Sequence, residues 1–359
     1  MTDTRLGGAV ALWASLVIAC GTPSEDDDAS SADATSTITP PGSSSDPSNP
    51  TASSGMPPGT TSASSTGSPP DTGTTEAVED TGPPVYFDLG ELPDTQKIDE
   101  ACGAVDFLFV IDNSGSMLDE QINLVNSFPG FITAIQNTLE QVNEYNIGVV
   151  TSDAYSPNLA IPGCNVLGGL VRQTGGSGSS NADCGPYADG NAYMTEADDL
   201  QMTFACAAQV GTNGDPFEQM MSGLLNAVDG PLLDPGACNE GFIREDALLV
   251  LVIITDEYDG PGDPESNPSP GTPMEWYDQV VAVKGGIPEN VVVVSLVNAM
   301  GGSCPPASTV FDGVNIVDFT TMFGDNGLVG GVCDMDYSVL FADAVSIIDV
   351  ACDNFEPPN

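Results

Sequence analysis

Four short runs rich in apolar residues, most of them uniformly apolar, are the clearest pattern in the chain, at 104–112, 145–151, 247–255 and 291–298. Uniformly apolar strands are typical of a parallel sheet that is covered on both faces. Elsewhere, apolar residues recur at the three- and four-residue spacing of amphipathic helices. This spacing predicts a helix at 120–144, and further helices are predicted at 198–210, at 216–228 with a proline in its first turn, at 272–284 with a capping box at its start, and at 337–353. The alternation predicts an α/β fold with an open, mostly parallel central sheet and helices on both faces.

Two local signals refine this pattern. Pro129 should interrupt or restart the helix at 120–144, with Ser127 as a possible N-cap, because proline removes a helical hydrogen bond. Segment 153–200 is rich in glycine and contains two cysteines, which predicts a loop-rich insertion. Within it, 167–173 is predicted to be a short edge strand.

The first quarter of the chain lacks the apolar residues that a core requires. Residues 1–19 contain Arg5 and then an apolar run that is too short to span a bilayer stably, as in an export signal. Residues 20–84 are mostly Ser, Thr, Pro, Gly and Asp, which predicts a disordered linker. A short segment, 85–103, then leads into a folded domain at 104–356.

The end of the apolar N-terminal run has a further feature. The sequence Leu16-Val17-Ile18-Ala19-Cys20-Gly21 resembles the lipobox of bacterial lipoproteins. The resemblance implies cleavage before Cys20 and lipidation of its thiol, which would anchor the chain to a membrane of the bacterial cell envelope. Gly21, in place of an aspartate, favours the outer membrane, on either its periplasmic or its surface face. An ordinary signal peptide with an incidental Cys20 and an uncleaved membrane anchor are the alternatives.

Charge and composition exclude several classes of function. The formal net charge is −47, with 52 acidic and 5 basic residues, so the chain has no basic surface for nucleic acid. The chain contains no histidine. This absence excludes Ser-His-Asp and Cys-His nucleophiles and the common histidine-containing zinc sites. The excess acid indicates a strongly solvated surface or, alternatively, weak calcium binding at acidic loops.

Eight cysteines remain when Cys20 is set aside, and their wide spacing in an exported chain predicts four disulfides. In an α/β sheet the last helix returns to the side where strands begin, which favours a pair between Cys102 and Cys352. Proximity in sequence favours the pairs Cys164–Cys184, Cys206–Cys238 and Cys304–Cys333.

Oxygen-bearing side chains follow two of the apolar runs. Asp112, Ser114 and Ser116 come directly after the first run, and Asp256 follows the third. Because the carboxyl ends of parallel strands meet at one edge of a sheet, these residues should lie close together. Small hard cations prefer such oxygen ligands. The sequence predicts a divalent-metal site, with a simple turn at Asp112 and serine caps on the next helix as the alternative.

The pattern Asp112-x-Ser114-x-Ser116 after a buried strand resembles the metal-ion-dependent adhesion site of von Willebrand factor A domains. The resemblance covers about 102–353 and implies a Rossmann-like fold. It also implies two ligands from other loops, Asp256 and the threonine of Gly211-Thr212, with Thr151 as the alternative threonine. The implied metal is Mg²⁺, with Mn²⁺ or Ca²⁺ as alternatives.

The resemblance implies a binding function. An acidic group of a protein or polymer partner would complete the metal shell, so the chain is predicted to be a membrane-anchored envelope lipoprotein that binds such a ligand and is not an enzyme. A structural envelope protein, in which the metal only stabilises the fold, is the main alternative. A metal-dependent hydrolase is a further one, with Glu257 or Asp259 as a possible base. Arg244 is predicted to form a structural ion pair, in preference to binding an anion.

Overall fold

The computed structural model describes residues 102–139, 142–215, 217–262, 267–299, 304 and 313–357. The predicted export signal, Cys20, the linker and most of the segment at 85–103 lie outside the described residues. Within the described part, no helix is both long and apolar enough to cross a membrane.

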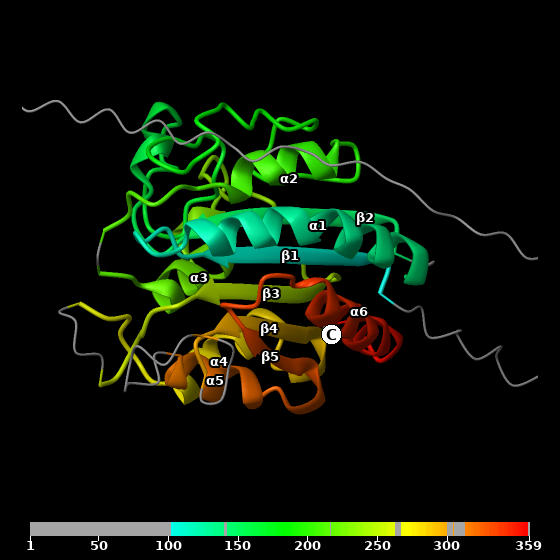
Figure 1. Cartoon of the computed structure of the whole chain (residues 1–359). Helices are drawn as coiled ribbons and strands as arrows, with labels where there is room; N and C mark the ends of the chain where they lie inside the picture. Colours follow the sequence, from blue (N-terminus) through cyan, green and yellow to red (C-terminus); the bar gives the residue numbers. More distant parts are fainter. Residues whose placement is uncertain are drawn as a thin grey trace, which may run out of the picture. The chain divides into compact units, whose positions relative to one another are not determined.

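A five-stranded, all-parallel sheet forms the centre of the domain (Figure 1). Its strand order is β2-β1-β3-β4-β5. The strands are β1 (Ala104–Ile111), β2 (Glu144–Thr151), β3 (Leu248–Thr255), β4 (Val291–Val297) and β5 (Gly327–Gly331). The first four are the predicted apolar runs, and every residue of β1, β3 and β4 is buried. The prediction of an open parallel α/β sheet is therefore confirmed.

Helices cover both faces of this sheet. They are α1 (Leu118–Thr138), α2 (Leu200–Ala208), α3 (Met220–Val228), α4 (Pro273–Val283), α5 (Val314–Thr321) and α6 (Ser338–Asp353). Successive strand residues point to opposite faces. Phe107 and Phe109 pack into the core beneath α1, α2 and α6, whereas Leu108 and Val110 pack beneath α3, α4 and α5.

The helix α1 continues through Pro129, so the predicted interruption is wrong. The residues on either side of the proline explain this result. Phe128 and Phe131 are buried, and their rings lie 5.8 Å from Phe109 and Phe107, respectively. Burial of two aromatic side chains offsets the lost helical hydrogen bond, because each removes a large apolar area from water.

Two elements at the far edge of the sheet, α5 and β5, were not predicted from the sequence. The strand β5 contains three glycines among five residues, which weakens any strand signal. Packing requires one of them: a side chain at Gly327 would place its Cβ 2.1 Å from the carbonyl oxygen of Thr320.

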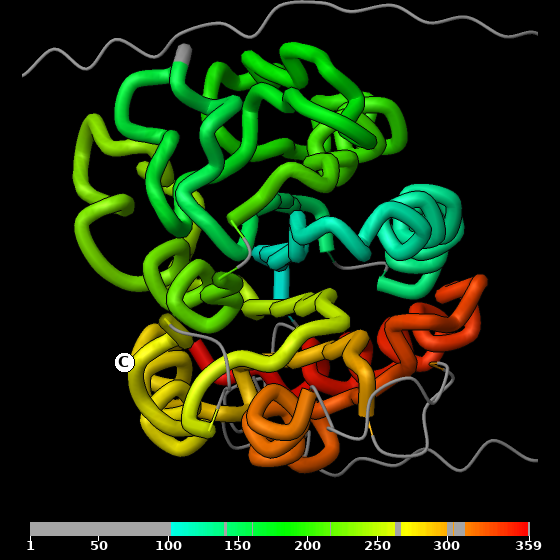
Figure 2. Tube along the Cα trace, turned by 60° about the vertical axis from the view of Figure 1, so that its left-hand side comes forward, coloured from blue at the N-terminus to red at the C-terminus, as the bar shows by residue number. Residues whose placement is uncertain are grey.

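The insertion between β2 and α2 lies on the side of the domain away from β4 and β5 (Figures 1 and 2). Its segment at 167–173 is not the predicted edge strand. Side-chain amides satisfy its backbone instead: Asn158 donates to the carbonyl of Leu170 and accepts from the N–H groups of Arg172 and Gln173. These bonds, with one backbone hydrogen bond from the Val171 N–H to the Val149 carbonyl of β2, take the place of a strand ladder.

Four disulfides join the eight cysteines of the domain. The pairs Cys102–Cys352 and Cys304–Cys333 agree with the sequence prediction. The predicted pairs Cys164–Cys184 and Cys206–Cys238 are wrong, because Cys164 pairs with Cys238 and Cys184 pairs with Cys206.

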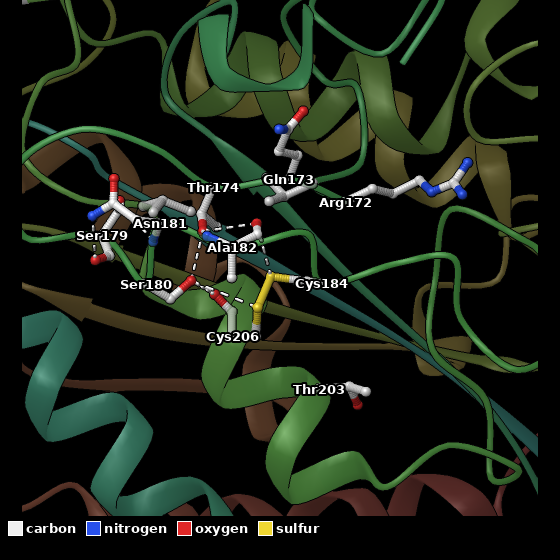
Figure 3. The surroundings of a disulfide bond; sticks show 12 residues. Arg172, Gln173, Thr174, Ser179, Ser180, Asn181, Ala182, Cys184, Thr203 and Cys206 are labelled. Atoms are coloured by element: carbon white, nitrogen blue, oxygen red, sulfur yellow. Dashed lines mark hydrogen bonds between the residues drawn. A yellow bond between two sulfur atoms is a disulfide. The ribbon is translucent and has the colours of Figure 1, made fainter. Parts of the chain in front are cut away.

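The folded insertion explains the exchange of partners. The side chain of Asn239, next to Cys238, accepts from Leu170 N–H and so holds the segment after Cys164. On the other side, the Ser180 hydroxyl donates to the carbonyl of Cys206 and draws the segment before Cys184 to α2 (Figure 3). Proximity in sequence was therefore a poor guide inside the insertion.

The disulfide Cys102–Cys352 links the segment just before β1 to the last turn of α6, with a sequence separation of 250 residues. Replacing both cysteines by alanine is expected to lower the free energy of unfolding by about 2–5 kcal/mol. The disulfide Cys184–Cys206 closes a loop of only 22 residues, so replacing both of its cysteines by alanine should cost about 2 kcal/mol less on chain-entropy grounds. Urea denaturation of both variants measures the difference; an equal or larger cost at Cys184–Cys206 would refute the chain-entropy account.

Candidate metal site at the carboxyl ends of β1 and β3

The carboxylate of Asp112 lies at the base of the candidate site. Its backbone N–H donates to the carbonyl of Ile254, which extends the pairing of β1 with β3 by one residue. One carboxylate oxygen accepts from the Ser114 N–H and the other from the Thr255 hydroxyl, both at 2.7 Å. The side chain is fully buried, and burial raises the pKa of Asp112 to about 6, with a further increase from nearby Asp256.

Two serines connect this buried carboxylate to the surface. The hydroxyls of Ser114 and Ser116 lie 3.2 Å apart, and the Ser116 hydroxyl donates to Asp256 at 3.0 Å. Ser114 is buried, Asp256 is half-buried and Ser116 is exposed. The structure therefore brings four of the predicted ligands together, in a row that begins at a buried acid and ends at solvent.

The loop that carries Thr212 is hydrogen-bonded to the Asp112 loop. Gln121 on α1 donates to the carbonyls of both Asp112 and Gly211 and accepts from the Gly211 N–H. The N–H of Gly214 donates to the carbonyl of Asn113 at 2.9 Å. Thr212 itself is half-buried, and its hydroxyl donates to the carbonyl of Ser177 at 3.3 Å.

Thr151, the alternative threonine, lies at the end of β2 and is buried. Its hydroxyl donates to the carbonyl and the carboxylate of Asp153. Both threonine loops contact the Asp112 loop: the loop after Thr151 binds the Asn113 side chain through Ser152 and Asp153, and the Thr212 loop binds its backbone and Gln121.

Two residues of the site were not predicted from the sequence. Thr255 positions the Asp112 carboxylate, and Gln121 joins the two loops. Thr255 could have been found, because it directly precedes Asp256 on a strand expected beside β1. Gln121 gave a weaker signal: a polar residue on the buried face of a helix, only 1% exposed.

The donor set suits a hard cation. It comprises two carboxylates that disfavour each other's charge and the hydroxyls that lie between them. Among the described residues, no cluster of three or more acidic, cysteine or histidine side chains could hold a metal ion, so a cation here would depend on the serine hydroxyls. Oxygen donors with one deeply buried carboxylate match the preferences of Mg²⁺, Mn²⁺ or Ca²⁺.

The strand order and the three loops around Asp112 decide the type of fold. The described domain has a von Willebrand factor A-type fold. No family model matches the chain, and no curated protein sequence matches it. The remaining comparisons are with solved structures.

Several von Willebrand factor A-type structures are similar to it. Proximal thread matrix protein 1 from the mussel byssus is 11% identical, with a TM-score of 0.36, over 69% of this chain and 49% of that one. A second structure of that protein has a zinc-occupied MIDAS motif. The pilus adhesin SpaC of Lactobacillus rhamnosus GG is 14% identical, with a TM-score of 0.36, over 68% of this chain and 30% of that one.

A von Willebrand factor type A protein from Catenulispora acidiphila is 16% identical, with a TM-score of 0.34, over 68% of this chain and 42% of that one. The chain thus spans half or less of the length of the solved structures it matches. Its own sheet order and loop contacts, and not these low TM-scores, define the fold type.

The side chain of Gln121 offers a test of how the two loops are joined. Gln121→Leu leaves the Gly211 N–H and the carbonyls of Asp112 and Gly211 without this partner, and each such loss costs about 1–3 kcal/mol. The free energy of unfolding is expected to fall by at least about 2 kcal/mol on that basis. Gln136→Leu, at an exposed position of the same helix, is the matched control. Equal losses in the two variants, measured by urea denaturation, would contradict the proposed bridging role.

Proposed function

We propose that the domain is a binding module that recognises an acidic group of a protein or polymer ligand through a divalent cation, with Mg²⁺ as the first choice and Mn²⁺ or Ca²⁺ as alternatives. The observation that carries this proposal is the row Asp112–Ser114–Ser116–Asp256, which leads from a buried carboxylate to an exposed hydroxyl. A cation bound there would supply a positive charge accessible to a partner's carboxylate. Thr212 is proposed as the further ligand from the second loop.

The arrangement of the chain's own residues favours binding over chemistry. Ser114 and Ser116 have no histidine to act as their base, because the chain contains none. Thr255 and the Ser114 N–H hold the Asp112 carboxylate in place, so its oxygens are directed before any ligand arrives. A rigid donor set of this kind supports affinity, since little ordering entropy is lost on binding.

We also propose that the chain acts in the bacterial cell envelope as a lipoprotein anchored through Cys20. The support is the sequence Leu16-Val17-Ile18-Ala19-Cys20-Gly21 and the composition of the linker that follows it. Mass spectrometry of the N-terminal peptide from a membrane fraction tests this point. An acylated N-terminus at Cys20 is expected; an unmodified N-terminus at another residue would refute the anchor.

Selection from a displayed library of random heptapeptides tests the binding function. The full chain is expected to enrich peptides containing Asp or Glu in the presence of Mg²⁺ and to release them in EDTA. Asp256→Ala should lose this enrichment. A chain that shows a Mg²⁺-dependent rise in melting temperature but selects no acidic peptides would instead support the purely structural role of the metal.

A further inference from the structure

A cavity of about 300 Å³ opens beside the candidate metal site. Both loops of that site contribute to its wall, through Asn113 from the first and Asn213 from the second. The insertion supplies most of the remaining wall, including Asp153, Tyr155, Gln173 and Thr174. The volume is at the small end of the range of ligand pockets and suits one side chain of a larger ligand.

Asn113 connects the cavity to the metal site. It stands between Asp112 and Ser114 in sequence, and its amide donates to the Asp153 carboxylate at 3.3 Å. Its amide oxygen accepts from the Ser152 hydroxyl at 2.9 Å. One side chain therefore fixes the cavity wall relative to the proposed metal ligands. Asp153 is thus hydrogen-bonded to the residue that directly follows Asp112, so a ligand segment of a few extended residues can reach both sites.

The lining of the cavity favours a cation. Asp153 is the one charged residue in the lining, and no Lys or Arg contributes to it. Its carboxylate accepts from the Asp215 N–H, the Asn113 amide and the Thr151 hydroxyl, which hold it in place without neutralising it. The strongly acidic net charge of the chain acts in the same direction.

The cavity also has an apolar side, and hydrogen bonds hold the residues of its wall in place. Half-buried Pro157 supplies apolar surface along which the methylene stem of a basic side chain can lie, and Tyr155 and Val210 line the cavity as buried residues. The Tyr155 hydroxyl donates to the carbonyl of Val210 at 2.6 Å, which fixes the ring. Behind Thr174, the Ser180 hydroxyl reaches α2 next to the disulfide Cys184–Cys206 (Figure 3).

We propose that this cavity binds the ammonium or guanidinium group of the ligand, while a carboxylate of the same ligand lies at the metal site. The inference rests on the proposed function, because it assigns a second anchor to the same ligand. The recognised element is then a peptide segment in which a Lys or Arg stands within about three residues of an Asp or Glu.

The same random heptapeptide library tests this inference with three variants of the full chain. Asp153→Asn removes the negative charge from the cavity. Gln173→Lys places a cation in the cavity. The Gln173 side chain points away from the disulfide Cys184–Cys206, so this change leaves the contacts around that disulfide intact (Figure 3). Asp229→Asn, at an exposed position outside the cavity, is the matched control for loss of one negative charge.

Among peptides selected in Mg²⁺ by the wild type and by Asp229→Asn, basic residues near an acid should be enriched about fivefold, the ratio expected from about 1 kcal/mol for a partly screened charge pair. Asp153→Asn and Gln173→Lys should lose the basic enrichment and keep the acidic one. Acidic enrichment without basic enrichment in the wild type, or basic enrichment that persists in both cavity variants, would overturn the cavity assignment and leave the proposed function standing. Failure of the wild type to enrich acidic residues would overturn both.

Discussion

Replacing Arg244 by alanine is expected to destabilise the domain by about 3–5 kcal/mol at neutral pH, the usual cost of leaving a buried charge without its partner. The Arg244 guanidinium lies 2.7 Å from the carboxylate of Asp106, which is fully buried near the start of β1. The Arg244 N–H also donates to this carboxylate. Arg244 is thus the structural ion-pair residue that the sequence predicted.

The expected loss depends on pH. Burial raises the pKa of Asp106 to about 6, while Arg244 opposes that rise, so removal of Arg244 should raise this pKa further. A carboxyl group whose pKa is higher in the folded than in the unfolded state binds protons more tightly when folded. Its contribution to stability is complete below the unfolded pKa of 3.8 and is lost as pH rises through the folded value. The destabilisation by Arg244→Ala should therefore be larger at pH 8 than at pH 5.

Urea denaturation at the two pH values measures this effect. Arg172→Ala is the matched control, because Arg172 forms no ion pair with a carboxylate among the described residues; its cost should stay near or below about 1 kcal/mol and vary little with pH. A pH-independent loss in Arg244→Ala, or a loss no larger than that of Arg172→Ala, would contradict the account.

Replacing Asp112 by asparagine is expected to abolish stabilisation by Mg²⁺. The wild type should gain about 2.7 kcal/mol at a Mg²⁺ concentration one hundred times its dissociation constant, and the variant should gain nothing. In EDTA the variant should be as stable as the wild type or more stable. The wild type then keeps a buried carboxylate whose charge is disfavoured by burial and by Asp256. Residues that serve binding often cost stability in this way.

Thermal unfolding of both proteins, in Mg²⁺ and in EDTA, tests this expectation. Asp229→Asn removes one exposed negative charge and should respond to Mg²⁺ as the wild type does. If Asp112→Asn were stabilised by Mg²⁺ as strongly as the wild type, the ion would be acting through the acidic surface and not through this site.

Much of the fold could be predicted because its strands carry a simple signal. The runs that became β1, β3 and β4 are apolar at nearly every position, as a sheet covered on both faces requires. By contrast, β5 consists mainly of glycine, and its place is set by packing against Thr320. The interruption expected at Pro129 is absent because the burial of Phe128 and Phe131 outweighs the local helix chemistry.

The candidate site was predictable where it depends on the sheet, and less so where it depends on the insertion. Asp112 and Asp256 follow neighbouring parallel strands, so the rule that strand carboxyl ends meet was enough to bring them together. The disulfide partners of Cys164 and Cys206, and the cavity beside Asn113, depend on how the insertion folds back through side-chain amides. No periodic pattern in the sequence encodes those contacts.

A titration with Mn²⁺, followed by the electron paramagnetic resonance of the free ion, tests the central claim most directly. Mn²⁺ stands in for Mg²⁺ here, and the measurement separates a tight site from diffuse binding to the acidic surface. Ser116→Ala removes the hydroxyl that joins Ser114 to Asp256 without changing the net charge. The account predicts a tight Mn²⁺ site in the wild type that is lost in Ser116→Ala, while weak binding stays the same. Equal tight binding by both proteins would contradict the account.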